Sequence, residues 1–318
     1  MTRHRLFLLA ALVLLSLGRA AADEPWFFIQ ISDPQLGFFS ANRDSVQDAS
    51  NFEFVVDNVN RLRPEFLIVT GDLVHQTSDP DQIAEYRRII AKVDPAIPVH
   101  TLSGNHDLTN SPTPETIAAY TELYGPDHYT FRHRGLTGIV LNSTLMHTPA
   151  QAPEQYAAQN EWLRTELAKA KSGDAKHTVI FLHHPWFVQS ADEPDGGANL
   201  PLALRKEFLP LFHESGVRYS FSGHTHRSFE SRDGDFENVT TGAVGKPLGG
   251  SSSGIRVVVV RDEGLEHHFF ELGRLPTEID FSRKLGGGAA KKPAAPGGKP
   301  ESAAPRPNSP APLRPGEP

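Results

Sequence analysis

Short apolar runs rich in valine, isoleucine and phenylalanine recur along most of this chain, with polar turn-forming residues between them. Runs of this length and composition are typical of buried β-strands. We therefore expect strands at residues 26–32, 66–70, 99–103, 128–133, 137–142, 178–183, 217–222, 238–242, 255–261 and 265–272.

Helical patterns separate many of these strands. Asp79-Pro80 and Thr113-Pro114 have the form of helix starts, because a capping side chain precedes a proline in each. Strands that alternate with helices, followed by a run of strands, predict a layered α/β fold whose sheet mixes parallel and antiparallel strands. We expect the helices at residues 52–61, 79–92, from 113 onward, 155–171 and 200–214.

The two ends of the chain differ in composition from its middle. Residues 1–22 begin with basic side chains, continue through an apolar run and end in Ala20-Ala21-Ala22, which predicts a cleaved signal peptide. The alternative is an uncleaved anchor, although the apolar run is short for a bilayer span. Residues 286–318 are rich in glycine, alanine and proline, so we expect a disordered tail there.

Residues 23–285 remain as one predicted domain, and removing the ends sharpens its charge. The whole chain of 318 residues has a formal charge of −7. Because the leader and the tail each contribute +3, the domain carries −13, which argues against nucleic-acid binding and favours attraction of metal cations. The chain has no cysteine and therefore no disulfide. We expect a periplasmic or secreted protein with no membrane span after cleavage.

Polar residues gather where five of the predicted strands end. In layered α/β folds, ligands bind at the carboxyl ends of strands. One such residue is usually a turn residue, but five clusters of Asp, Asn and His in one domain predict a metal site. A glycine precedes the key residue in three clusters, where it permits close approach of the backbone. The clusters are Asp33, "TGD" at 70–72, "SGNHD" at 103–107, "FLHHP" at 181–185 and "SGHTH" at 222–226.

In order and spacing, these clusters resemble the motifs of the calcineurin-like metallophosphoesterase family. The strings "SDPQLG", "GDLVH", "LNST" and "GIRVVVV" further resemble the subgroup named for calcineurin-like phosphoesterase domain-containing protein 1, whose members open with D-P-Q. The resemblance covers most of residues 26–272. It implies a four-layer α/β/β/α sandwich with two mixed β-sheets and a dinuclear metal site at the strand ends.

The resemblance also implies a role for each motif residue. His106 would face the phosphate-ester substrate as general acid, and Asp107 would orient its imidazole. A hydroxide that bridges two divalent metal ions would attack the phosphorus. The implied ligands are Asp33, Gln35 and His226 for the first metal, Asn105, His183 and His224 for the second, and Asp72 for both.

Three positions leave a choice. The family pattern H-x-P favours His183 over His184, and Phe181 and His183 share a strand face. His75 is as readily a loop residue as a substrate contact. Gln35 stands where a histidine is expected. As a ligand it would bind through its amide oxygen and favour Mn or Mg over Zn or Fe at the first metal; otherwise it points outward and this metal is held loosely.

Three functions remain open at this point. The first is a phosphomonoesterase acting on phosphoproteins or small phosphate esters. The second is a phosphodiesterase or nucleotide pyrophosphatase of the same family, because some diphosphatases of that family also carry D-x-Q. The third is a non-catalytic metal-binding surface domain, which the intact His106-Asp107 pair disfavours. The sequence gives neither the oligomeric state nor the metal pair among Mn, Fe, Zn and Mg. The polar loop at residues 189–199 is a candidate gate.

Overall fold

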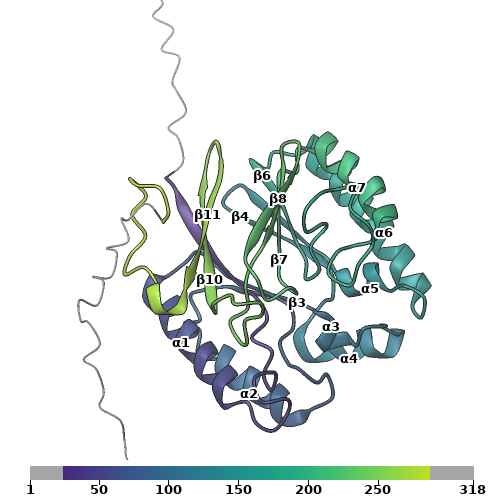
Figure 1. Cartoon of the computed structure of the whole chain (residues 1–318). Coiled ribbons are helices and arrows are strands. Elements are labelled where there is room, and N and C mark those ends of the chain that lie inside the picture. The colour runs from purple at the N-terminus through teal and green to yellow at the C-terminus, as the bar shows by residue number, and fades with distance from the viewer. Residues whose placement is uncertain (1–23, 287–318) are drawn as a thin grey trace, which may run out of the picture. The chain divides into compact units, whose positions relative to one another are not determined.

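The computed structural model describes residues 24–286. The predicted signal peptide and the predicted tail beyond Gly286 lie outside these residues. Within them, two β-sheets pack face to face, and helices cover the outer face of each sheet (Figure 1). No helix in this part of the chain has the length and hydrophobicity that a bilayer span requires.

The first sheet has five strands in the order β11-β10-β1-β2-β3. Its strands are β1 (Trp26–Ile31), β2 (Leu67–Thr70), β3 (Val99–Leu102), β10 (Gly254–Arg261) and β11 (Gly264–Glu271). β2 runs parallel to β1 and β3, whereas β10 is antiparallel to β1 and β11. The parallel part brings the carboxyl ends of β1, β2 and β3 to one edge of the sheet.

The second sheet has six strands in the order β4-β5-β6-β7-β9-β8. Its strands are β4 (Tyr129–His133), β5 (Leu136–Val140), β6 (His177–Phe181), β7 (Tyr219–Ser222), β8 (Phe229–Asp233) and β9 (Phe236–Thr240). The four central strands are parallel, and β4 and β8 are antiparallel to their neighbours at the two edges. Both sheets are therefore mixed, as predicted.

The ten predicted strands are confirmed, and β8 is an addition. Only Ser231 among the five residues of β8 is buried, because the strand lies at a sheet edge and pairs on one side. Phe229 is the one apolar residue of this strand, so its sequence shows no apolar pattern. A turn signal was nevertheless available, since Gly234-Asp235 joins β8 to β9 and Gly234 has a φ of 55°.

Capping side chains mark the starts of two predicted helices. Asp79 accepts hydrogen bonds from the backbone of Asp81 and Gln82, and Thr113 accepts one from Thr116, so both predicted starts are confirmed. α1 begins at Val46, six residues before the predicted start, because mostly polar residues fill its first turns and hide the apolar pattern. The helices are α1 (Val46–Leu62), α2 (Pro80–Ile90), α3 (Asn105–Leu108), α4 (Pro114–Tyr124), α5 (Ser143–His147), α6 (Pro153–Ser172), α7 (Leu202–Ser215) and the 3-10 helix η1 (Leu272–Arg274).

Three apolar cores hold the layers together. Between the sheets, the Phe28 and Phe66 rings stack at 4.6 Å, and the Phe221 ring meets Phe28 edge-on at 5.8 Å. α1, α2 and α4 pack on the outer face of the first sheet. α5, α6 and α7 pack on the outer face of the second sheet. The predicted α/β/β/α sandwich is confirmed, and each fully buried phenylalanine contributes roughly 1.5–3 kcal/mol to it.

Candidate metal centre

Residues that follow strands of the first sheet contact residues that follow strands of the second sheet. Asp33, after β1, accepts a hydrogen bond from the backbone N–H of His224, after β7, at 3.1 Å. The Asp72 Oδ2 atom, after β2, lies 3.3 Å from the Nε2 atom of His183, after β6. Asp33, Asp72 and His224 have φ values of 51°, 51° and 70°. Such left-handed conformations of non-glycine residues are strained and cluster at functional sites.

Glycines allow the strand ends to approach this closely. A Cβ atom on Gly104 would overlap the Asp72 carboxylate, and one on Gly223 would overlap the Ser32 side chain. The sequence pattern of a glycine before the key residue therefore reflects a steric need, as predicted.

One set of side chains, here called the nitrogen-rich group, consists of Asn105, His183 and His224 together with Asp72. The Asn105 Oδ1 atom lies 3.1 Å from His183 Nε2 and 3.0 Å from His224 Nδ1. These two imidazole nitrogens are 3.2 Å apart. One ligand atom from each of Asp72, His183 and His224 falls within the span that a single metal ion can occupy.

The outer nitrogens of the two imidazoles indicate which inner atoms carry lone pairs. The Nδ1 atom of His183 lies 2.9 Å from the carbonyl oxygen of Thr70, and the Nε2 atom of His224 lies 2.9 Å from that of Gly197. A carbonyl oxygen only accepts, so each of these nitrogens carries the hydrogen. In the neutral rings, His183 Nε2 and His224 Nδ1 are then acceptors that face each other. They also face two acceptor oxygens, Asn105 Oδ1 and Asp72 Oδ2. Such a cluster of acceptors fits a bound cation.

The electrostatics of the nitrogen-rich group agree with this assignment. Burial opposes ionisation of both partners, yet the charge of Asp72 raises the pKa of His183 to about 9. Burial and the neighbouring His183 lower the pKa of His224 to about 4. The group therefore favours one added positive charge, for which a proton and a metal ion compete.

The second set, here called the oxygen-rich group, consists of Asp33, Gln35 and His226 together with Asp72. The Nε2 atom of His226 lies 3.4 Å from Asp33 Oδ1, while its Nδ1 donates to the carbonyl oxygen of Lys246 at 2.6 Å. Ligand atoms of Asp33, Asp72 and His226 also converge on a position suited to a metal ion. Burial raises the pKa of Asp33 above its ordinary value, which a bound cation would counter.

Gln35 provides the clearest test of whether this group fits a metal. Its side chain is fully buried, and its Oε1 atom has no hydrogen-bond partner. Its Nε2 atom lies 3.2 Å from Nδ1 of His75, so the amide points into the protein and not outward. A buried acceptor without a partner is costly, and a cation would satisfy it. The donor set of this group is therefore suited to a metal that prefers oxygen.

Asp72 belongs to both groups, which matches the bridging position that the family resemblance implies. Its carboxylate is buried, and although burial opposes its charge, His183 holds its pKa well below the usual range. Its Oδ1 atom also accepts the backbone N–H of His106 at 2.9 Å. An ionised carboxylate between two cation positions is the arrangement expected of two-metal sites.

His106 lies at the edge of the centre and is partly exposed. Its Nδ1 atom lies 2.8 Å from the carbonyl oxygen of His75, so Nδ1 carries a hydrogen. Its ring stacks on the His75 ring with centroids 4.7 Å apart. Within residues 24–286, its Nε2 atom has no hydrogen-bond partner.

The predicted contact between Asp107 and the His106 imidazole is wrong. Asp107 lies in the third position of the short helix α3, so its carboxylate turns back onto backbone N–H groups. It accepts from Gly104 at 2.7 Å and from Leu73 at 2.9 Å. Asp107 therefore ties the loop after β2 to the loop after β3, and the His75 carbonyl oxygen orients the imidazole instead.

The structure separates His183 from His184. Ser143 Oγ accepts the backbone N–H groups of both residues, at 3.0 and 2.8 Å, which leaves its hydroxyl hydrogen for Nδ1 of His184 at 3.2 Å. The His184 ring stacks between those of His147 and His224 and supplies no atom to either group. His183 is thus the histidine that joins the centre.

The loop at residues 189–199, which the sequence offers as a gate, is braced in this structure. The fully buried Arg205 donates to the carbonyl oxygens of Ala191 and Glu193, and the Glu193 carboxylate accepts three backbone N–H groups. The same loop supplies the Gly197 carbonyl oxygen that holds His224. The loop therefore acts as a support for the nitrogen-rich group.

Two neighbours of the oxygen-rich group complete its surroundings. The Phe38 ring lies 5.2 Å from that of His226 and 4.8 Å from that of His75, so Phe38 borders the site. Trp186 and Phe187, which follow β6, are fully buried in the core under α6 and α7. Lys246 was missed, because no motif surrounds it and only the fold brings it to His226.

A third set of possible ligands lies elsewhere, at Glu230, Glu237 and His267. The guanidinium of Arg256 donates to His267 at 2.8 Å and pairs with Glu230 at 3.3 Å. This arginine already supplies the positive charge, so the set does not need a metal.

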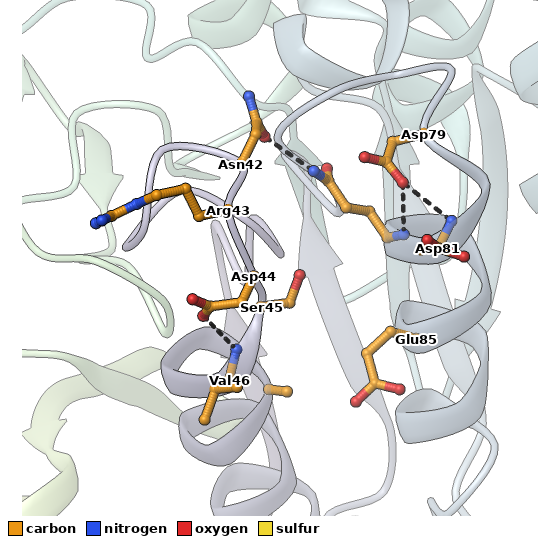
Figure 2. A pocket seen from close by; sticks show the side chains of 10 residues that line it. Asn42, Arg43, Asp44, Ser45, Val46, Asp79, Asp81 and Glu85 are labelled. Carbon is orange, nitrogen blue, oxygen red and sulfur yellow. Dashed lines mark hydrogen bonds between the residues drawn. The ribbon is translucent and has the colours of Figure 1, made fainter.

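A pocket of about 380 Å³ also lies outside the metal centre (Figure 2). It separates the 42–46 segment from α2, and Asp44, Asp79, Asp81 and Glu85 line it. Gln82 crosses it to Asn42 at 2.9 Å and accepts the His75 backbone N–H, so this pocket borders the support of His75.

Comparison with known proteins agrees with this geometry. The family profile described as calcineurin-like phosphoesterase matches residues 28–228. A serine/threonine-protein phosphatase of Rattus norvegicus, CPPED1, is 34% identical over 266 residues, which cover 79% of this chain and 85% of the relative. A dimetal phosphatase structure from Danio rerio has a TM-score of 0.52 at 15% identity and covers 77% of this chain and 99% of its own.

A further structure shares the fold. It is GAP50, described as the anchor in the inner membrane complex of Plasmodium, with a TM-score of 0.58 at 17% identity, covering 78% of this chain and 85% of its own. At this identity the likeness concerns the fold alone. The profile match and the extended similarity to CPPED1 show more: this chain belongs to the calcineurin-like phosphoesterase family of dinuclear metal-dependent hydrolases.

Proposed function

We propose that this protein is a phosphomonoesterase that hydrolyses phosphorylated proteins or small phosphate esters. The observation that carries the proposal is the position of His106 beside Asp72, the residue shared by both ligand groups. Relatives that match most of the chain are named serine/threonine-protein phosphatases, which supports a monoester substrate.

The chain's own residues divide the work between binding and proton transfer. Asp33, Gln35 and His226 would hold the first divalent metal, Asn105, His183 and His224 would hold the second, and Asp72 would serve both. When bound, two divalent cations would polarise the phosphate and lower the pKa of water. His106, kept in one orientation by the His75 carbonyl oxygen, gives the proton on its Nε2 to the leaving oxygen.

His106→Ala tests this role. The variant keeps the backbone N–H that binds Asp72, so we expect both metals to stay while turnover falls about 10²–10⁴-fold, the range for loss of a general acid. Elemental analysis and hydrolysis of p-nitrophenyl phosphate measure the two effects. His213→Ala, which removes a partly exposed imidazole paired with Asp233, is the control. Loss of both metals from His106→Ala would refute the assigned role.

A phosphodiesterase or nucleotide pyrophosphatase of the same family is the second candidate, because Gln35 gives this chain a D-x-Q opening. Comparison of kcat/KM for p-nitrophenyl phosphate and bis-p-nitrophenyl phosphate separates the two. Faster diester cleavage would overturn the proposed monoesterase. A metal-loaded protein that is inactive on every ester would favour the non-catalytic alternative. GAP50, a structure of the same fold, is described as an anchor, which supports keeping that alternative.

We further propose that the protein is exported to the periplasm or the medium after removal of residues 1–22. The apolar leader and the absence of cysteine support this location. Cell fractionation and N-terminal sequencing test it, and we expect the mature chain to begin at Asp23. An intact Met1 in a cytoplasmic fraction would contradict it.

A further inference from the structure

Lys246 is a cation without an anionic partner at the rim of an acidic centre. Its side chain is half-buried, and its Nζ atom lies 5.0 Å from the centroid of the Phe38 ring. Within residues 24–286 its ammonium has no ion pair, in contrast to Lys92, which is paired with Glu53 at 2.6 Å. An aromatic face holds an ammonium in place without neutralising its charge. Lys246 therefore keeps its charge for another partner.

The backbone around Lys246 is fixed to the oxygen-rich group. The carbonyl oxygen of Lys246 accepts the Nδ1 hydrogen of His226 at 2.6 Å, and the neighbouring Gly245 N–H donates to the Asp33 carbonyl oxygen at 3.0 Å. A Cβ atom on Gly245 would overlap the carbonyl oxygen of Pro34, so this approach needs glycine. Two proposed metal ligands thus position the residue that carries the ammonium.

A row of rings connects Lys246 with the position of His106. The ammonium lies over Phe38, the Phe38 ring contacts His75, and His75 stacks on His106. Phe38 itself is positioned by Asp48, whose carboxylate accepts the backbone N–H groups of Gly37 and Phe39 at 3.0 and 3.2 Å. Only the Oδ2 atom of Asp48 accepts these amides, and its Oδ1 atom is buried without a hydrogen-bond partner. Burial raises the pKa of Asp48 to about 6, and the charge of Lys246 partly opposes this rise, although no ion pair joins the two residues. The cation thus lies at one end of a row of aromatic rings whose other end is His106.

We propose that Lys246 selects phosphate monoesters over diesters by binding one of the non-bridging phosphate oxygens of a monoester. In a diester, the corresponding oxygen is esterified and no longer carries charge. A monoester is mostly a dianion at neutral pH, because its second pKa is about 6, whereas a diester is a monoanion. One fixed cation at the rim favours the more highly charged ligand. This inference rests on the proposed phosphoesterase chemistry and names the residue that sets its substrate class.

Substitution of Lys246 tests the inference on the metal-loaded full chain. We expect Lys246→Gln to lower kcat/KM for p-nitrophenyl phosphate by about ten- to a hundredfold, the usual effect of losing one hydrogen bond to a charged group. The value of kcat/KM for bis-p-nitrophenyl phosphate should fall by less than about threefold. Lys246→Arg should retain most of the discrimination. Lys92→Gln, at a paired surface lysine, is the matched control and should change neither value.

Metal content and phosphate binding keep the test independent of folding and of activity. Both metals should remain in Lys246→Gln, because only its backbone contacts a proposed ligand. An equal loss for both esters, or no loss for either, would overturn the inference while leaving the monoesterase intact. If the wild-type protein hydrolyses neither ester, the proposed function fails. The affinity of inorganic phosphate then decides, and equal affinity in wild type and Lys246→Gln would overturn the role of Lys246.

Discussion

The two ligand groups of the centre occupy the same edge of the fold but differ in chemistry. The nitrogen-rich group places two imidazoles and one amide around Asp72, whereas the oxygen-rich group places a carboxylate, an amide and one imidazole around it. Imidazole nitrogen suits Zn and Fe, and oxygen suits Mn and Mg. One shared carboxylate can thus join two cation positions with different preferences.

The supports of the two groups differ as well. His224 relies on the carbonyl oxygen of Gly197, in a long loop that Arg205 and Glu193 brace. His226 relies on the carbonyl oxygen of Lys246, in a segment hydrogen-bonded to the residues that follow β1. The first support is a long loop, and the second is the segment between β9 and β10, which is hydrogen-bonded to Ser32 and Asp33. Substitutions in each should therefore affect one group more than the other.

The largest expected effect is at the shared residue. Asp72→Asn removes the one carboxylate common to both groups, so we expect both metals to be lost. Loss of a residue that only supports a ligand lowers activity by about 10- to 100-fold, so loss of this shared ligand should lower turnover by more than about a hundredfold. Elemental analysis and p-nitrophenyl phosphate hydrolysis measure this. Asp79→Asn, at a helix cap that asparagine also satisfies, is the control. Retention of two metals at wild-type affinity would break the idea of a shared ligand.

Gln35→His should change the preference of the oxygen-rich group without emptying it. Replacing an amide oxygen by an imidazole nitrogen should shift the ratio of Zn to Mn affinity by about tenfold, which corresponds to ~1.4 kcal/mol. Competition between the two ions, followed by elemental analysis, measures the ratio. His184→Gln is the control, since His184 supplies no atom to either group. An unchanged ratio would place Gln35 outside the metal's ligands.

Arg205→Met should have the smallest effect and should separate the two supports. It removes the donors that brace the 189–199 loop, so His224 loses part of its orientation. We expect up to about tenfold weaker binding of the second metal, the lower range for a supporting residue, with the first metal unaffected. Stepwise removal by a chelator resolves the two metals. Arg164→Met, on the surface of α6, is the control. Equal weakening of both metals would show that the loop does not act on one group alone.

Much of this centre could be predicted because its signals are local in sequence. Each ligand follows an apolar strand, and Gly71, Gly104 and Gly223 mark the turns at which the loops approach one another. The strands themselves show in the apolar runs. β8 escaped because its sequence holds one apolar residue, Phe229, whereas the edge strand β4 keeps Tyr129 and Phe131 in alternation.

The supports could not be predicted because they depend on contacts between distant parts of the chain. Asp107 was assigned to its neighbour His106, but helix geometry turns it toward the loop after β2. Lys246 lies 20 residues from His226 in a segment without a motif. The tautomers of the histidines follow from carbonyl oxygens such as that of Gly197, and every residue type has such an atom.

The central claim is that one carboxylate and two unlike ligand groups hold two metal ions that together support phosphomonoester hydrolysis. Titration of the metal-free full chain with Mn, followed by elemental analysis and p-nitrophenyl phosphate turnover in the same samples, tests it most directly. The account predicts that two equivalents bind and that turnover rises with the second. Full turnover after one equivalent, or two bound equivalents without hydrolysis of any phosphate ester, would contradict it.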